Sequence, residues 1–193
     1  VDAIKSEPVF EAHPLGHRYA IDLVKQVANM NTGKYLDEEL QDVTPTNFCI
    51  GVAAYPEKHF EAPNLTTDMR WLKSKIEAGA EYLVTQMFFD NSKYFAFVEK
   101  CKEMGINVPI IPGLKPITTR KQLTSLPKAF HVDIPQELID RIEACKTDAD
   151  VKSEGIQWCV EQSKELMKAG APCLHYYTMS NAEITCRIAE KVF

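Results

Sequence analysis

The feature that most constrains the fold of this chain is a repeated alternation of short apolar runs with longer segments of helical spacing. Each apolar run has the length of a buried strand, and the segment after it repeats apolar residues every three or four positions. The predicted strands are residues 48–55, 82–89, 108–112 and 173–178. Because parallel strands are joined through helices, this order predicts an α/β protein with a parallel sheet.

The predicted helices have recognisable ends. They cover residues 16–30, 68–78, 91–104, a short segment from Thr118 or Thr119 that Pro127 cuts off, 136–145, 151–169 and 181–192. Gly79, Gly105 and Gly170 stand where three of them should end, since glycine readily forms a left-handed C-terminal cap. Residues 1–14, which include Pro8 and Pro14, are predicted to form a loop, and the polar segment 31–47 an exposed insertion.

Four strand-helix units are half of an eight-stranded barrel. A doubly wound sheet would more often show a G-x-G-x-x-G fingerprint after its first strand, and the sequence has none. The expected architecture is therefore a TIM-type (β/α)8 barrel. Residues 1–193 would supply about its last four strand-helix units, as a single domain.

Composition excludes several classes of function. The net charge is -5 with acids and bases interspersed, whereas a nucleic-acid surface needs clustered Lys and Arg. No apolar run reaches the roughly 18 residues of a membrane span, and the N-terminus lacks the order of a secretory signal, so a cytoplasmic protein is expected. The six cysteines are scattered singly, which favours buried or half-buried free thiols over disulfides or a metal site.

Polar side chains gather at the ends of the first two strands. In parallel α/β proteins ligands bind where strands end and helices begin. The residues expected around one mouth are Tyr55, Glu57, His59, Asp68, Gln86 and Asp90. A tyrosine face can stack on a flat heterocycle, and a histidine can hydrogen-bond a phosphate or a ring edge. The alternative is that Tyr55 and His59 are ordinary surface residues of a loop.

Asp68 and Lys75 lie seven positions apart, two turns from each other on one helix face. A carboxylate at the helix start can accept a ribose hydroxyl, and an ammonium can meet a pyrophosphate. An acid favoured by the helix dipole and a solvated lysine explain the same spacing without any ligand.

Gln86 stands in an otherwise apolar run, VTQMFFD, where a buried amide needs a hydrogen-bond partner. That partner is either another side chain or the amide-like edge of a bound ring. Gly113 after the third strand allows a ligand or a neighbouring loop to approach closely, and Gln122 could reach the same mouth. His175 is expected to be a core or helix-facing histidine, and His131 is given no role.

Five motifs occur together in order: Y-P-x-x-H-x-E-A, D-x6-K-x3-A-G-A, T-Q-x-F-F-D, I-P-G and H-Y-Y-T. From about Arg18 to its end the chain therefore resembles the methylenetetrahydrofolate reductase family. The resemblance implies a TIM barrel that binds FAD at the carboxyl ends of its strands. It also implies hydride transfer from NAD(P)H to 5,10-methylenetetrahydrofolate, giving 5-methyltetrahydrofolate for methionine biosynthesis.

The resemblance assigns roles residue by residue. The positions that match FAD-contacting residues of the family are Tyr19, Ala20, Tyr55, His59, Ala62, Asp68 and Lys75. Gln86 matches a glutamine that holds the folate and that lies against nicotinamide, and Gln122 matches a further folate-contacting position. Residues 178–181 lack the arginine that many relatives offer to the folate tail.

The family's catalytic glutamate and the aspartate of its R-G-D motif have no counterpart in residues 1–193. The resemblance places both upstream, so no catalytic residue is expected in this chain, which alone would be incomplete and inactive. The alternative is a non-catalytic half-barrel that associates with a partner and binds flavin weakly or not at all. Its unpaired strand edges would favour a homo-oligomer.

Overall fold

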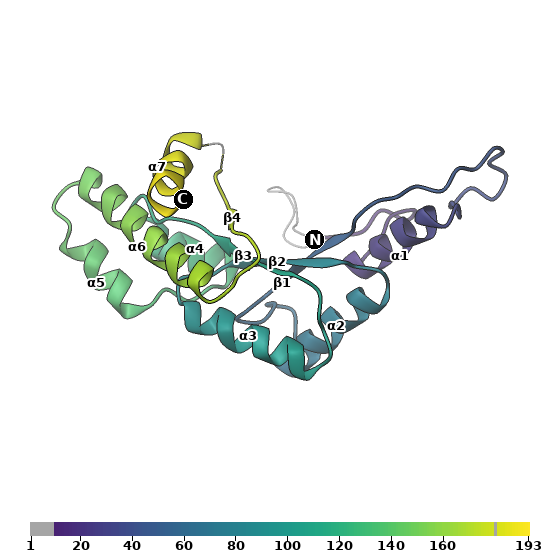
Figure 1. The fold of residues 1–193 in the computed structure, drawn as a ribbon, viewed down its shortest axis with the longest axis horizontal. Coiled ribbons are helices and arrows are strands. Elements are labelled where there is room, and N and C mark those ends of the chain that lie inside the picture. The colour runs from purple at the N-terminus through teal and green to yellow at the C-terminus, as the bar shows by residue number, and fades with distance from the viewer. Residues whose placement is uncertain (1–9, 180) are drawn as a thin grey trace.

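The computed structural model describes residues 10–179 and 181–193; the predicted loop at 1–14 lies partly outside them. The elements are α1 (Ala20–Asn31), β1 (Gly51–Ala54), α2 (Leu65–Glu77), β2 (Tyr82–Met87), α3 (Asn91–Glu103), β3 (Ile110–Leu114), α4 (Gln122–Phe130), α5 (Gln136–Ala144), α6 (Asp148–Lys168), β4 (His175–Tyr176) and α7 (Ala182–Val192). The strands form one parallel sheet in the order β1-β2-β3-β4 (Figure 1). The predicted α/β fold with a parallel sheet is confirmed.

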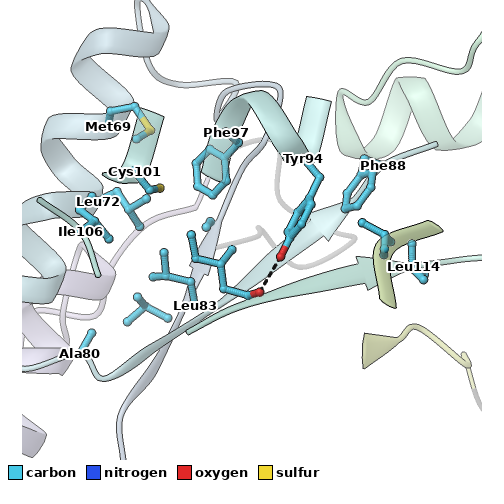
Figure 2. Close-up of a cluster of buried hydrophobic side chains, with 14 of the residues drawn as sticks. Met69, Leu72, Ala80, Leu83, Phe88, Tyr94, Phe97, Cys101, Ile106 and Leu114 are labelled. Carbon is cyan, nitrogen blue, oxygen red and sulfur yellow. Dashed lines mark hydrogen bonds between the residues drawn. The ribbon is translucent and has the colours of Figure 1, made fainter. Parts of the chain in front are cut away.

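The main hydrophobic core lies between one face of this sheet and the helices. Figure 2 shows Leu83 of β2 beside Met69 and Leu72 of α2 and Phe97 of α3, all of them buried. Buried residues of α6 and α7 continue the same cluster. The Tyr94 hydroxyl, within this core, donates to the carbonyl oxygen of Ile110 at 2.8 Å, so its polar atom is satisfied. Burial raises the pKa of Tyr94 to about 12.

A second, smaller core fills the space among α4, α5 and α6. Its buried residues are Met87, Phe89, Ile117, Leu126, Val132, Leu138, Ile142 and Val151. Gly155 makes this packing possible, because a Cβ at that position would lie 1.6 Å from the carbonyl oxygen of Ile117. Helix α6 therefore lies directly on the backbone that follows β3.

Helix α1 and the polar segment after it lie at the right of Figure 1, where α1 packs against α2 and buries Val24 in the main core while the polar segment extends outward. Residues 32–49 contain no helix or strand and are mostly exposed. The Asn31 side chain holds the base of this segment, since it donates to the Phe48 carbonyl and accepts from the Phe48 N–H at 2.9 and 2.8 Å.

Several helix ends differ from the sequence prediction, among them the start of α2, which lies at Leu65 instead of residue 68 because the Asn64 side chain accepts the Thr67 N–H at 2.8 Å. Helix α1 begins at Ala20 instead of residue 16, and the Asp22 carboxylate accepts the Tyr19 N–H at 3.3 Å there. Helix α6 begins at Asp148 instead of 151, because Thr147 and Asp150 form a reciprocal capping pair.

Pro127 does not end α4 as predicted. The helix continues to Phe130, because the Pro127 carbonyl still accepts the His131 N–H at 2.9 Å. His131 then ends it in the left-handed conformation, with φ of 55°.

The six cysteines are free thiols. Cys101 and Cys159 are buried and Cys145 is half-buried, but Cys49, Cys173 and Cys186 are exposed. The expectation of buried or half-buried thiols is wrong for these three: Cys49 and Cys173 lie in the segments before β1 and β4, and Cys186 lies on the exposed side of α7. Within residues 10–179 and 181–193, no helix has both the length and the apolar composition needed to cross a membrane.

Candidate ligand-binding site at the strand ends

The loop after β1 brings aromatic rings together at the carboxyl end of the sheet. The Tyr55 and His59 rings meet edge to face, with centroids 4.5 Å apart. Phe60 lies 4.8 Å from His59 on one side and stacks on His131 at 4.8 Å on the other. Two of the predicted site residues are therefore in contact, and a residue from the end of α4 joins them.

Hydrogen bonds to the backbone fix this loop against α2. The His59 N–H donates to Asp68 Oδ2 at 2.8 Å. Lys58, whose φ is 96°, donates from Nζ to the carbonyl oxygens of His59 and Ala62 at 3.0 and 2.6 Å. Ala62 is buried, with 2% of its surface exposed. The structure thus places His59, Ala62 and Asp68 in one folded unit.

Lys75 brings a positive charge to the same unit. Its Nζ donates to the carbonyl oxygen of Ala53, on the edge strand β1, at 2.7 Å. Burial lowers the pKa of Lys75, and the nearby Asp68 carboxylate opposes that shift. This half-buried ammonium can bind an anion at the strand end, provided that it releases the Ala53 carbonyl.

His59 is held in its neutral form. Burial lowers the pKa of its imidazole, although Glu61 and Asp68 oppose the change. Nδ1 accepts the Glu61 N–H at 3.3 Å, so in the neutral ring Nε2 carries the proton. His59 can therefore donate a hydrogen bond from Nε2 without adding positive charge.

Gln86 is half-buried and lies on the face of β2 opposite the helices. The expectation of a buried amide is wrong, because the neighbouring residues Ala53 and His175 on that face are exposed. Its Oε1 accepts the N–H of Met87 at 2.9 Å, which is its one hydrogen bond within the described part of the chain. The bond is local, so the carboxamide can turn toward a ligand at low cost.

Glu57 ties the loop after β1 to the turn after α4. Its Oε2 accepts the Asp133 N–H at 3.0 Å, while Oε1 is buried and has no partner among the described residues. Burial raises the pKa of this carboxyl. Beside it is a cavity of about 10 Å3 that Tyr55, Gln86 and His131 also line. This is the space of one water molecule, so a larger ligand must lie over the strand ends.

The structure does not join the other predicted residues to this group by any hydrogen bond or ion pair that it describes. Gln122 fixes the turn before its own helix, with Oε1 accepting the N–H groups of Thr118 and Thr119 at 2.6 and 3.2 Å. Tyr19 and Ala20 lie at the start of α1, where Tyr19 is 56% exposed and has Arg18 over its ring.

Two expectations near β3 and β4 change. His175 is exposed and contacts the Tyr177 ring at 4.7 Å, so it is neither a core nor a helix-facing residue. It is the first residue of β4, the last strand of the described sheet on that side. A Cβ on Gly113 would lie 2.2 Å from the Thr85 carbonyl and 2.7 Å from the Tyr177 ring. The close approach at Gly113 is therefore made by the protein's own neighbours.

The sequence did not indicate His131, Phe60 or Asp133 as neighbours of this site. Their contacts join the loop after β1 to the turn after α4, more than 70 positions along the chain. A lone histidine or phenylalanine carries no spacing signal at that separation. The Tyr55 and His59 pair could be found because both lie in one short motif.

The chain is similar to known proteins of one family. The model of the family described as methylenetetrahydrofolate reductase matches residues 2–192. Methylenetetrahydrofolate reductase 1 of Schizosaccharomyces pombe is 34% identical over 195 residues, which cover 98% of this chain and 30% of that protein. The 5,10-methylenetetrahydrofolate reductase of Escherichia coli is 36% identical over 143 residues, covering 74% of this chain and 48% of that protein. The chain thus spans less than half the length of either relative.

A solved structure has a similar fold. It is an uncharacterised protein from Clostridium thermocellum, described as binding two copies of 5-methyl-5,6,7,8-tetrahydrofolic acid. The TM-score is 0.56 at 22% sequence identity, and the match covers 90% of this chain and 68% of that one. At this identity the likeness concerns the fold alone.

Proposed function

This chain belongs to the methylenetetrahydrofolate reductase family, and from that membership we propose that its protein reduces 5,10-methylenetetrahydrofolate to 5-methyltetrahydrofolate with NAD(P)H and FAD. The product would supply a methyl group for methionine biosynthesis. The observation that carries the proposal is the grouping of His59, Asp68 and Lys75 at the end of β1, with Gln86 on the adjacent strand.

We also propose that the sheet is part of a TIM-type (β/α)8 barrel. The strands follow one another in chain order, and the buried face of the sheet packs against helices. A doubly wound sheet would instead reverse its strand order at a switch point. In a barrel the half-exposed face with Val84 and Gln86 would be the interior.

The residues at the end of β1 fit a flavin dinucleotide. Lys75 offers an ammonium for the pyrophosphate, and Asp68 uses only Oδ2 for His59, which leaves its other oxygen for a ribose hydroxyl. Neutral His59 offers an Nε2 donor, and the Tyr55 ring offers an apolar face. When bound, the flavin would supply a carrier that takes a hydride from NAD(P)H and gives it to the folate.

Gln86 would orient the folate. A carboxamide has one acceptor and two N–H donors, which matches the amide-like edge of the pterin ring. Turning toward that ring would cost only the local bond to the Met87 N–H. Gln122 is a second proposed folate contact; its amide oxygen holds the turn before α4, and its amide nitrogen would be the group that donates to the folate.

The test is the absorption spectrum of the full-length protein. We expect a yellow protein whose flavin band NADH or NADPH bleaches in the absence of oxygen, and which 5,10-methylenetetrahydrofolate restores. A protein that stays colourless after incubation with FAD would contradict the proposal. If NADH or NADPH bleaches the flavin but 5,10-methylenetetrahydrofolate does not restore the band, the proposed cofactor would be supported and the proposed substrate would be contradicted.

A further inference from the structure

A groove of about 490 Å3 lies outside the site at the strand ends, between the start of α3 and the helices α5 and α6. Asp90, which the sequence analysis expected at the mouth of the strand ends, lines this groove, and the groove shares no lining residue with the cavity beside Gln86. Its volume is in the range of sites that bind small molecules, roughly 300 to 1,000 Å3. The proposed function leaves this groove without a role.

The charged residues that line the groove are all acidic. They are Asp90, Glu137, Glu161 and Glu165, and no lysine or arginine is among the lining residues. Arg141, outside the lining, contacts Glu161 at 3.0 Å and Glu137 at 3.9 Å. Asp90 and Glu165 have no ion-pair partner in the described ranges. Both accept neutral hydrogen bonds, from the Ser92 N–H and the Asn91 amide at 2.8 and 2.6 Å.

Gln162 in the groove wall has an unsatisfied buried acceptor. The residue is 5% exposed, and its Nε2 donates to the Phe88 carbonyl and to Asn91 Oδ1 at 3.3 and 3.1 Å. These two bonds fix the orientation of the amide, and Oε1 is left without a partner among the described residues. Buried acceptors are nearly always paired, so this oxygen in the groove wall still lacks a donor, which a water or a ligand can supply.

The groove also has aromatic surface. Phe95 and Trp158 line it, and the Trp158 Nε1 donates to the Phe89 carbonyl at 3.1 Å, which holds the indole in place. The Arg141 guanidinium lies 5.1 Å from the centre of the Trp158 ring. Because Arg141 already places a cation near this ring, the indole offers apolar contact area to a ligand's stem and not a further site for its charge.

We propose that this groove binds a small organic cation, an ammonium or guanidinium group on an aromatic or aliphatic stem. Asp90 and Glu165 supply the negative charge, the Gln162 oxygen accepts an N–H, and Phe95 and Trp158 contact the stem. The proposal does not depend on the reductase activity.

The test uses three probes of similar shape and different charge: phenethylammonium, phenethyl alcohol and hydrocinnamate. Each is titrated into the full-length protein and followed by calorimetry and by ligand-observed NMR. We expect saturable millimolar binding of phenethylammonium, binding of the alcohol weaker by about fivefold or more, and no binding of the anion. Equal affinity for all three probes, or no saturable binding of phenethylammonium, would overturn the proposal.

Two variants and a control test whether phenethylammonium binds in the groove. Glu165→Gln keeps an acceptor for Asn91 but removes the charge, and it should weaken phenethylammonium binding by about threefold to tenfold. Glu77→Gln, an exposed acid on α2, is the matched control and should have no effect. Gln162→Met, checked for folding by circular dichroism, should also weaken binding. If that variant does not fold, Glu165→Gln decides, and an unchanged affinity there rejects the groove.

Discussion

The two faces of strand β2 differ in what covers them. Leu83, Thr85 and Met87 on one face are at most 3% exposed, whereas Tyr82, Val84 and Gln86 on the other are half-buried. The covered face packs against helices and follows the apolar pattern of the sequence. The half-exposed face carries Gln86, the polar residue of the strand that we assign to substrate. Stability and ligand binding therefore depend on alternate residues of the same six-residue strand.

The largest expected effect is on the free energy of unfolding, from a substitution on the covered face. Leu83→Ala should lower the free energy of unfolding by about 2 to 5 kcal/mol, because it leaves a cavity in a closed core. Val84→Ala, one residue away, should cost less than about 1 kcal/mol because its side chain is half-exposed. Urea unfolding of residues 1–193, followed by circular dichroism, measures both. Equal losses would break the comparison.

The next effect concerns the half-exposed face. Gln86→Ala should lower kcat/KM for 5,10-methylenetetrahydrofolate by about tenfold to a hundredfold in the full-length protein, with flavin content unchanged. The free energy of unfolding should change by less than about 0.5 kcal/mol, since the bond lost is local. Gln157→Ala, an amide on α6, is the control. Parallel loss of flavin and folate use would show that the Gln86 amide is structural.

A substitution of Lys75 tests the proposed FAD contact beside β1, next to the half-exposed face. Lys75→Met should weaken FAD binding by about tenfold, the usual effect of losing one charge-assisted hydrogen bond. Lys73→Met on the same helix controls for the loss of a surface charge. Quenching of flavin fluorescence on binding gives both dissociation constants. Two equally weakened variants would point to a general effect of net charge.

The smallest expected effect is on the pH dependence of stability, from a substitution of Glu57. Burial raises the pKa of its carboxyl above the ordinary value of 4.5, so the folded protein holds this proton more tightly than the unfolded chain. Its contribution to stability is present below pH 4.5 and is lost as pH rises through the folded pKa. Glu57→Gln, which keeps an acceptor for the Asp133 N–H, should flatten this decline. Urea unfolding at several pH values checks it, with Glu77→Gln as the charge control; an unchanged slope would contradict it.

Local patterns in the sequence predicted most of the fold. Strand β2 begins at Tyr82 as predicted, and α2 ends just before Gly79, whose φ of 117° suits a helix stop. What failed depended on contacts that the sequence pattern does not show, within one helical turn for Pro127 and across the chain for β4. Pro127 lies inside α4, and β4 shortens to two residues, because it pairs only with Gly113 and Leu114.

The site divides in the same way. Tyr55, His59 and Asp68 lie within 14 positions and meet as their motif suggests. The partners that complete the mouth, His131 and the backbone of Asp133, come from the turn after α4. Nothing in the sequence near either residue encodes that distant pairing. The half-exposure of Gln86 likewise depends on what lies over the sheet, which the apolar run VTQMFFD does not record.

The hydrogen bond from Lys75 to the Ala53 carbonyl has a consequence for self-association. Ala53 is on an edge strand, and free backbone acceptors on such an edge recruit strands from other molecules. Among the described residues, the ammonium occupies one of these acceptors and sets a positive charge beside it. A strand that paired with β1 along this side would therefore have to displace Lys75 from the Ala53 carbonyl.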